Sequence, residues 1–304
     1  MEKISEKVYF IRGKNSGRFP FCNVLLVDNV LIDAGAGIEI IKELAKKTES
    51  LVLSHTHPDH ASGAWIFNEL GKRVFAPKGV ATDLDSLAIR FVTEKLSKTW
   101  KEFFTSPSIG MRSFRAEGYE EGLLNDMLKC KIEIEAVATP GHTDDHHVFI
   151  IDGKVIYGAD IDLTSFGPFY GNPEGNMELF KKSIEKVLEF DVEVFVSSHA
   201  DPIFGKNRIE EKLIWYLEFF DKRDEILLNL LNEPKSIEEL VEISPFYRKK
   251  PYVKEMLDFF EMNMIKQHLA KLLREGKIKR IGEKYIKKSQ NFLNDNFSFE
   301  SNGE

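Results

Sequence analysis

Three histidines and an aspartate fall within six positions of one short turn, and this spacing constrains the fold more than any other feature. The pattern is His-x-His-x-Asp-His at residues 55–60. The apolar run at 50–54 predicts a short buried strand, and residues 61–70 predict a helix. The four side chains should therefore lie at the carboxyl end of a strand, where layered α/β folds bind their ligands. Neutral imidazoles and carboxylates together suit zinc, iron or manganese.

The composition is that of a globular chain with no evident export or membrane signal. Of the 304 residues, 42% are hydrophobic and 30% are charged, and no apolar run approaches the roughly 20 residues of a membrane-spanning helix. The N-terminus lacks the basic and then apolar order of a secretory signal. We therefore expect a cytoplasmic protein with no membrane partner. Its only cysteines, Cys22 and Cys130, should be reduced and buried.

Residues 1–204 alternate strand-like and helix-like segments. Strand-like runs separated by turn residues occupy 8–11, 22–27, 30–33, 73–76, 131–139 and 192–197. Asp152-Gly153 predicts a hairpin turn between strands at 147–151 and 154–157. Apolar residues have helical spacing at 38–47 and 176–190. Strands interleaved with helices indicate a layered α/β fold for this first domain.

The segment 80–130 interrupts this alternation. It is expected to be a mostly helical insertion, with Phe91, Leu96, Trp100, Phe103 and Phe104 among its apolar members. An insertion of this size beside a site can act as a lid or a substrate wall. It can equally be a peripheral helical pair that only packs, and the sequence leaves both interpretations open.

The character of the chain changes near residue 205. Residues 205–288 carry 19 Lys and Arg against 15 Asp and Glu, whereas the whole chain has a net charge of −7. Helices are predicted at 209–231 and 262–274, another is opened by the capping box at 236–239, and a small hairpin is predicted at 277–286. This order is typical of a winged helix, so we place a second domain at 205–288. The polar residues 289–304 are expected to form a flexible tail.

Three further residues share the topological position of the histidine turn, because each follows a predicted strand. With the turn they make seven groups, enough to hold two ions. Asp160, with two carboxylate oxygens, is the natural bridge between them. Paired cations lower the pKa of a shared water toward neutrality and hold charge that develops on the attacked oxygen. The seven candidate ligands are His55, His57, Asp59, His60, His142, Asp160 and His199.

The order His-x-His-x-Asp-His, then Gly-His, then a lone Asp and a lone His resembles the metallo-β-lactamase superfamily over residues 1–204. The resemblance implies an αββα sandwich with the site at its edge. Asp33 matches an aspartate that supports the ligands in relatives, and it is not expected to bind metal. The resemblance implies a first metal on His55, His57 and His142, a second on Asp59, His60 and His199, and Asp160 as the bridge.

Over the whole chain the resemblance is narrower. The run Thr139-Pro140-Gly141-His142-Thr143-Asp144-Asp145-His146, followed by a winged helix, resembles the β-lactamase-like group that includes a mitochondrial endoribonuclease. The last histidine departs from the Pro-Gly-His-Gly-Pro of relatives, because here it lies in Ser197-Ser198-His199-Ala200-Asp201-Pro202. We expect His146 to pack or hydrogen-bond beside the site, His147 not to bind metal, and His268 to lie on the surface.

The sequence and the resemblance together predict a metal-dependent hydrolase that uses a metal-bridging hydroxide on an ester, thioester or phosphodiester. Two divalent metal ions are expected, zinc first, with iron or manganese as alternatives. Asp59 is the candidate catalytic residue that holds or accepts the proton of the nucleophile. A small-molecule ester or thioester, as in the glyoxalase II branch, suits the acidic body of the chain. The loop at 167–173 follows Asp160 closely and is the best candidate for a wall near the metals.

Several alternatives stay open. An endoribonuclease acting on single-stranded RNA is suggested by the winged helix and by the basic run Arg248-Lys249-Lys250, although a solvated loop explains that run as well. A mononuclear-iron persulfide dioxygenase-like enzyme is a further alternative. The C-terminal domain can also serve only to form a homodimer or to shape the pocket.

Overall fold

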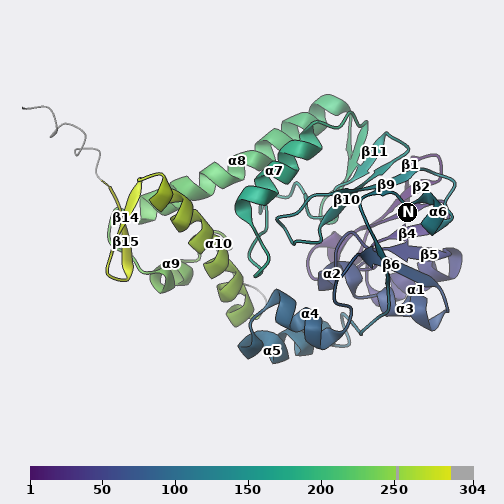
Figure 1. The fold of residues 1–304 in the computed structure, drawn as a ribbon, viewed down its shortest axis with the longest axis horizontal. Coiled ribbons are helices and arrows are strands. Elements are labelled where there is room, and N and C mark those ends of the chain that lie inside the picture. Colours follow the sequence, from purple (N-terminus) through teal and green to yellow (C-terminus); the bar gives the residue numbers. More distant parts are fainter. Residues whose placement is uncertain (251–252, 289–304) are drawn as a thin grey trace, which may run out of the picture.

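The computed structural model describes residues 1–250 and 253–288. Figure 1 shows two packed sheets with helices outside them and a helical arm formed by the C-terminal residues. The tail predicted at 289–304 lies outside the described residues. Within residues 1–250 and 253–288, none of the helices combines the length and the hydropathy that a membrane span requires.

The first sheet has seven strands in chain order, antiparallel from β1 to β4 and parallel from β4 to β7. A short 3-10 turn, η1 (Lys14–Gly17), lies between β2 and β3. The strands are β1 (Glu2–Ser5), β2 (Val8–Ile11), β3 (Val24–Val27), β4 (Val30–Ile32), β5 (Ser50–Val52), β6 (Arg73–Pro77) and β7 (Glu117–Tyr119).

The second sheet has six strands in the order β13-β12-β11-β10-β9-β8. The predicted hairpin is confirmed: Phe149 pairs with Tyr157, and Asp152 and Gly153 both have positive φ, as a tight hairpin turn of this kind requires. The strands are β8 (Gly122–Leu123), β9 (Ile134–Ala138), β10 (His147–Ile151), β11 (Val155–Tyr157), β12 (Val194–Val196) and β13 (Ile203–Phe204).

Alternating side chains along the strands build four layers. In the first sheet, Leu31 packs toward helix α1 (Ile38–Lys47), whereas Ile32 faces the second sheet. In the second sheet, Phe149 faces the first sheet and Val148 packs toward α7 (Met177–Leu188). The order helix, sheet, sheet, helix confirms the expected αββα sandwich.

Only the first half of the 80–130 segment is helical, so the expectation of a mostly helical insertion is wrong for its second half. The first half forms α4 (Leu84–Phe91) and α5 (Glu94–Phe104). The second half contains the short helix α6 (Asn125–Leu128) and adds β7 to one sheet and β8 to the other. These strands are two or three residues long and form by pairing with β6 and β9, which local spacing cannot show.

The C-terminal residues form three helices and a hairpin, in the predicted order. The capping box at Ser236 and Glu239 is present at the start of α9. Helix α10 starts at Lys254, earlier than the predicted 262, and its first turns pack Met256 into the apolar cluster that includes Phe104 of α5. The elements are α8 (Lys206–Leu230), α9 (Ile237–Ile243), α10 (Lys254–Arg274), β14 (Ile278–Ile281) and β15 (Lys284–Lys287).

The three helices share an apolar core with the outer face of the second sheet. One buried cluster joins Phe180 of α7 to Tyr216 of α8 and Met264 of α10. The C-terminal helices therefore pack against the sandwich, and they contact the loops that surround the strand ends.

Candidate metal centre

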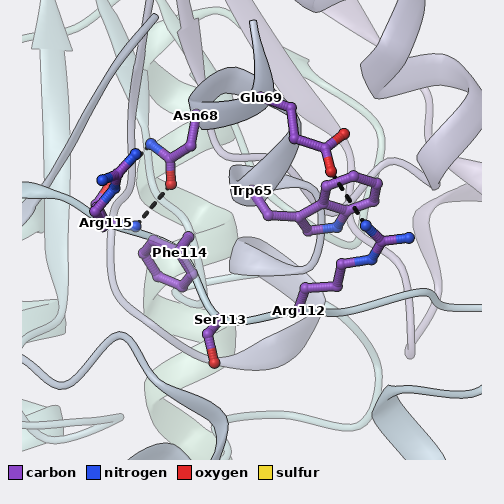
Figure 2. Close-up of a pocket in the computed structure, with 7 residues that line it drawn as sticks. All are labelled: Trp65, Asn68, Glu69, Arg112, Ser113, Phe114 and Arg115. Atoms are coloured by element: carbon purple, nitrogen blue, oxygen red, sulfur yellow. Dashed lines mark hydrogen bonds and ion pairs between the residues drawn. The ribbon is translucent and has the colours of Figure 1, made fainter. Parts of the chain in front are cut away.

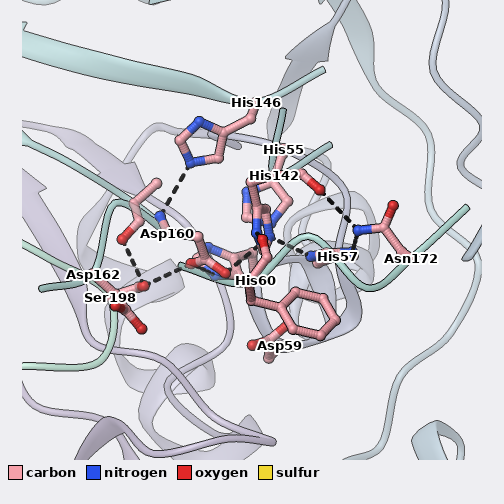
Figure 3. A network of polar contacts seen from close by, with 12 residues as sticks. His55, His57, Asp59, His60, His142, His146, Asp160, Asp162, Asn172 and Ser198 are labelled. Atoms are coloured by element: carbon pink, nitrogen blue, oxygen red, sulfur yellow. Dashed lines mark hydrogen bonds and ion pairs between the residues drawn. The ribbon is translucent and has the colours of Figure 1, made fainter. Parts of the chain in front are cut away.

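Four strand ends meet at one edge of the sandwich. The turn after β5 leads into α2 (Pro58–Ala61) and α3 (Ala64–Glu69), and the other three positions follow β9, β11 and β12. The structure brings all seven sequence-predicted residues together, and Figure 3 shows His55, His57, His142 and Asp160 in one network of polar contacts. The seven are His55, His57, Asp59, His60, His142, Asp160 and His199.

The side chains form two clusters that share one carboxylate. The first cluster is His55, His57, His142 and Asp160, and the second cluster is Asp59, His60, Asp160 and His199. Within each, one ligand atom per residue lies within 4.8 Å of the others.

Asp160 reaches both clusters with different oxygens. Its Oδ2 lies 3.0 Å from His142 Nε2, and its Oδ1 lies 2.8 Å from His60 Nε2 and 3.6 Å from His199 Nε2. Ser198 Oγ donates to Oδ1 at 2.7 Å and so fixes the carboxylate. This geometry is the one that a bridging carboxylate needs.

The residues of the first cluster fit a metal cation. His55 Nε2 is buried and has no hydrogen-bond partner among the described residues, which is costly for a polar atom unless a cation or another group accepts its lone pair. Burial lowers the pKa of both His55 and His57 well below the usual range, so both rings are neutral and can offer a lone pair. Neutral imidazole with carboxylate is a donor set for zinc, iron or manganese.

Hydrogen bonds on the outer nitrogens set the orientation of the other rings. His142 Nδ1 donates to the Phe169 carbonyl at 2.9 Å, and His199 Nδ1 donates to the Gly17 carbonyl at 2.6 Å. Because a carbonyl oxygen only accepts, each ring carries its proton on Nδ1. Nε2 of each ring then faces its cluster, the arrangement that metal-binding histidines use.

The second cluster favours positive charge. Burial alone would lower the pKa of His60, but the carboxylates of Asp160 and Asp33 outweigh it and raise that pKa well above its usual value. The same competition, with Asp160 and Asp59, raises the pKa of His199 to about 9. A divalent cation supplies the positive charge that these carboxylates favour.

Asp33 supports the centre from outside, as expected for its position. It is fully buried, and its two oxygens accept hydrogen bonds from the backbone N–H and the hydroxyl of Ser54, from Tyr157 Oη and from His60 Nδ1, all at 2.7–2.8 Å. Gly35 is required close by, because a Cβ there would lie 1.4 Å from the carbonyl oxygen of Asp59.

His146 lies beside the centre and hydrogen-bonds there, as predicted. Its Nδ1 donates to the Thr139 carbonyl at 3.0 Å, and its Nε2 accepts the backbone N–H of Asp160 at 3.1 Å. Burial lowers the pKa of His146 to about 3, which keeps Nε2 free to accept. His147 instead donates to the Asp145 carbonyl at 2.8 Å, away from both clusters.

Sequence reasoning missed an ion-pair network that joins three of the loops. Arg90 of α4 pairs with Asp145 Oδ1 at 2.7 Å and with both oxygens of Glu174, and it donates to Thr56 Oγ1. Asp145 also accepts the backbone N–H of Thr56 at 3.1 Å. Asp145 was visible as an acid inside the 139–146 motif, but no local signal marks Arg90, which lies far away in the sequence.

Aromatic residues of the 80–130 segment and of the loop at 167–173 divide between core and site. Trp100, Phe104, Tyr119 and Tyr170 are buried in the core. Phe169 lies against the centre, with its ring centroid 5.7 Å from that of His142 and 6.3 Å from that of His57. The loop at 167–173 therefore does form a wall of the centre.

The expectation that His268 lies on the surface is wrong. Its side chain is fully buried, with Nε2 2.7 Å from Tyr170 Oη and Nδ1 2.6 Å from Asp224 Oδ1. The helical pattern of α10 could not show that α8 and the loop at 167–173 close over this face.

Two surface hollows lie away from the centre. Figure 2 shows the first, of about 280 Å³, where Arg112 pairs with Glu69 and its guanidinium lies over the ring of Trp65. The second, of about 290 Å³, adjoins it around Asn68 and Arg73. Neither is lined by a residue of the two clusters, so neither bears on the proposed chemistry.

The sequence profile of the metallo-beta-lactamase superfamily matches residues 17–199 of this chain. The chain belongs to the metallo-beta-lactamase superfamily, whose members are generally hydrolases. Two curated relatives are named Beta-lactamase-like protein 2 homolog. The protein from Caenorhabditis elegans is 22% identical over 296 residues, 91% of this chain and 87% of the relative. The protein from Drosophila melanogaster is 23% identical over 248 residues, 79% of this chain and 74% of the relative.

Solved structures show the same fold over nearly the whole chain. A metallo-beta-lactamase family protein from Thermus thermophilus aligns with a TM-score of 0.70 at 20% identity, covering 94% of this chain and all of that one. A beta-lactamase domain protein from Burkholderia ambifaria aligns with a TM-score of 0.67 at 18% identity, covering 94% and 93%. These similarities extend into the C-terminal helices, and at such identity they establish the fold.

Proposed function

We propose that this protein is a metal-dependent hydrolase whose two clusters bind two divalent cations bridged by Asp160. The convergence of seven imidazole and carboxylate groups from four strand ends supports this more than any other observation. We assign zinc first, with iron or manganese as alternatives. When bound, two such cations lower the pKa of a shared water and stabilise negative charge on the attacked group.

We propose that Asp59 accepts the proton that the attacking water gives up. Its Oδ2 lies 3.4 Å from His199 Nε2 in the second cluster. Asp59 is the second residue of α2. An ionised carboxylate at this position can accept a proton and hold it while the substrate bond breaks.

For the substrate we propose a small-molecule ester or thioester. Arg90 lies among the loops around the centre, and two carboxylates already neutralise it. The wall beside His57 and His142 is the phenyl ring of Phe169. A neutral, partly apolar substrate suits such surroundings better than a polyanion does.

The second candidate function is an endoribonuclease acting on single-stranded RNA. The observation that favours it is the C-terminal hairpin, where Lys277, Lys279, Arg280 and Lys287 are exposed. Three helices followed by this hairpin lead us to propose a winged-helix domain at 205–288, a class of fold that often contacts nucleic acid. Phosphate contacts of this kind would make binding fall steeply with salt.

The persulfide dioxygenase alternative receives less support. Such a reaction needs one iron, whereas the second cluster here is complete, with Asp59, His60 and His199 all present around Asp160. Oxygen consumption by iron-loaded protein would distinguish a dioxygenase from a hydrolase.

A homodimer formed through the C-terminal domain is a separate alternative, and gel filtration would test it.

The decisive test loads metal-free protein with Zn²⁺, Mn²⁺ or Fe²⁺ and measures bound metal and turnover together. The substrates are a thioester, a carboxylic ester, a phosphodiester and single-stranded RNA, each also assayed in chelator. We expect two ions per chain and chelator-sensitive thioester or ester hydrolysis. Salt-sensitive RNA cleavage would instead favour the nuclease, and equal turnover with and without metal would exclude both.

A further inference from the structure

One loop lies between the first cluster and the C-terminal helices. Residues 166–175, here named the connecting loop, follow Asp160 and lead into α7. On one side the loop contacts metal-site histidines, and on the other it contacts α8 and α10. The contacts on the two sides come from neighbouring residues, Phe169 on the metal side and Tyr170 and Gly171 on the helical side.

On the metal side, the connecting loop sets the position of His142. The Phe169 carbonyl accepts the His142 Nδ1 proton at 2.9 Å, and Asn172 Nδ2 donates to the His142 carbonyl at 2.8 Å. Asn172 Nδ2 also lies 3.3 Å from His57 Nε2. The Phe169 carbonyl is an outer-nitrogen partner of the kind that orients a metal-binding ring and influences its affinity for the metal.

On the helical side, the phenol of Tyr170 joins a buried chain of hydrogen bonds. Arg223 donates to Tyr170 Oη at 3.0 Å, and the Tyr170 hydroxyl donates to His268 Nε2 at 2.7 Å. His268 in turn donates from Nδ1 to Asp224 at 2.6 Å. Burial lowers the pKa of His268 despite Asp224, which leaves Nε2 unprotonated and able to accept. Both ring nitrogens of His268 and the Tyr170 hydroxyl therefore have partners within this chain.

Backbone carbonyls of the connecting loop are held by the same two helices. Asn263 Nδ2 of α10 donates to the Gly171 carbonyl at 2.8 Å. Gln267 Nε2 of α10 donates to the carbonyls of Tyr170 at 3.1 Å and Gly175 at 3.0 Å. Arg223 of α8 donates to the Phe166 carbonyl at 2.8 Å. Side chains from outside the sandwich therefore satisfy polar groups on both flanks of Phe169 and hold the backbone of the loop in place.

We propose that Tyr170 and Asn263 are positioning residues of the first metal site, through which α8 and α10 fix the Phe169 carbonyl and hence the orientation of His142. This inference rests on the proposed function, because it concerns the affinity of a cluster that we assign to a metal. It gives the C-terminal helices a part in building the metal site, beyond any contact they make with substrate.

The test compares Tyr170→Phe and Asn263→Ala with the control Ser236→Ala in the full-length protein. Tyr170→Phe removes one hydroxyl from the buried chain. Asn263→Ala removes one hydrogen bond to the loop and improves helix propensity, so it should fold even if Tyr170→Phe does not. Ser236→Ala removes the α9 cap, which destabilises the same C-terminal region but touches no residue of the connecting loop.

The readouts are Co²⁺ affinity and the visible spectrum of bound Co²⁺, which reports coordination geometry and does not depend on turnover. Metal-free proteins are titrated with Co²⁺, and the binding step of the first cluster is identified with His142→Ala. We expect Tyr170→Phe and Asn263→Ala to weaken that step by about tenfold, the low end of losses from outer-partner mutations, and to shift its spectrum. Ser236→Ala should match wild type within about twofold.

Three results decide the matter. If wild type binds two Co²⁺ ions, and Tyr170→Phe and Asn263→Ala both match it in affinity and spectrum, the positioning inference is overturned while the proposed metal centre stands. If Ser236→Ala weakens Co²⁺ binding to the first cluster as much as Tyr170→Phe and Asn263→Ala do, general destabilisation explains the effect and the inference again fails. If wild type binds no Co²⁺ at the clusters, the proposed function itself fails.

Discussion

His142 Nε2 lies 2.7 Å from His57 Nδ1, although 85 residues separate the two histidines in the chain. His142 keeps its proton on Nδ1, against the Phe169 carbonyl, so its lone pair points toward His57. The two rings meet because β5 and β9 belong to different sheets that end at the same edge. A cation is the group that would accept lone pairs from both, and the predictions below start from this geometry.

Asp160→Asn should disable both clusters. The substitution removes the charge of the one carboxylate that faces His60, His142 and His199. We expect metal content to fall from two ions to one or none, with an affinity loss greater than the ~100-fold that outer-partner mutations reach. Elemental analysis after dialysis against metal buffer measures this. Asp191→Asn, at an exposed pair with Lys206, is the matched control and should retain both ions.

Metal removal should lower the stability of the fold. A cation that binds only the native protein stabilises it by mass action, about 4 kcal/mol per site at 1,000 times the Kd. Urea unfolding in zinc buffer and in chelator gives the difference in free energy of unfolding. Asp160→Asn should show a much smaller difference. Identical unfolding curves for wild type in zinc and in chelator would contradict metal binding at these clusters.

Asp33→Asn should weaken the second cluster and the fold together. Asp33 accepts four hydrogen bonds while fully buried, and an amide nitrogen cannot accept from Ser54, Tyr157 or His60. We expect a loss of about 3–5 kcal/mol in the free energy of unfolding and a 10- to 100-fold weaker metal affinity. Tyr157→Phe, which removes one of the four donors, should cost only about 1 kcal/mol. Equal effects of the two substitutions would argue against the role of Asp33 in orienting His60.

Arg90→Met should destabilise the protein at neutral pH. The substitution leaves the buried carboxylate of Asp145 and that of Glu174 without their cation. Losing one partner of a buried ion pair costs about 3–5 kcal/mol. Chemical unfolding of metal-free protein measures the loss, and Arg112→Met, at an exposed pair with Glu69, should change the free energy of unfolding far less.

The effect of Arg90→Met should also depend on pH in a defined direction. Burial alone would raise the pKa of Asp145, but the charge and hydrogen bonds of Arg90 hold that pKa below its usual value. In wild type this stabilisation is present above the unfolded-state pKa of about 3.9 and is lost as pH falls through the folded-state pKa. In the variant, burial raises the pKa, so protonation relieves the cost. The gap between the two proteins should therefore be widest at neutral pH and shrink toward about pH 4. A gap that widens on acidification would refute this assignment.

Elements with strong local signals followed from the sequence. The histidine turn after β5, the Asp152-Gly153 hairpin and the capping box at Ser236 all appear where residue types predict them. Such signals are short-range because a turn or cap is satisfied by residues within a few positions.

Elements that form by long-range pairing could not be predicted from the sequence. The strands β7 and β8 exist because β6 and β9 offer them hydrogen bonds, and His268 is buried because α8 and Tyr170 cover it. Arg90 lies at the site because α4 packs over the strand ends. None of these contacts has a counterpart in spacing along the chain.

The amino-acid sequence by itself determined the seven chemistry-bearing residues and their place after strands, since side-chain type and the alternation of apolar residues are local properties. The resemblance already implied two groups of ligands bridged by Asp160 and a supporting role for Asp33. Only the tertiary structure decided that Arg90 and the connecting loop hold these groups, and that α8 and α10 reach that loop. Those relations depend on which strand ends share an edge, and edges are set by the packing of the two sheets and the C-terminal helices.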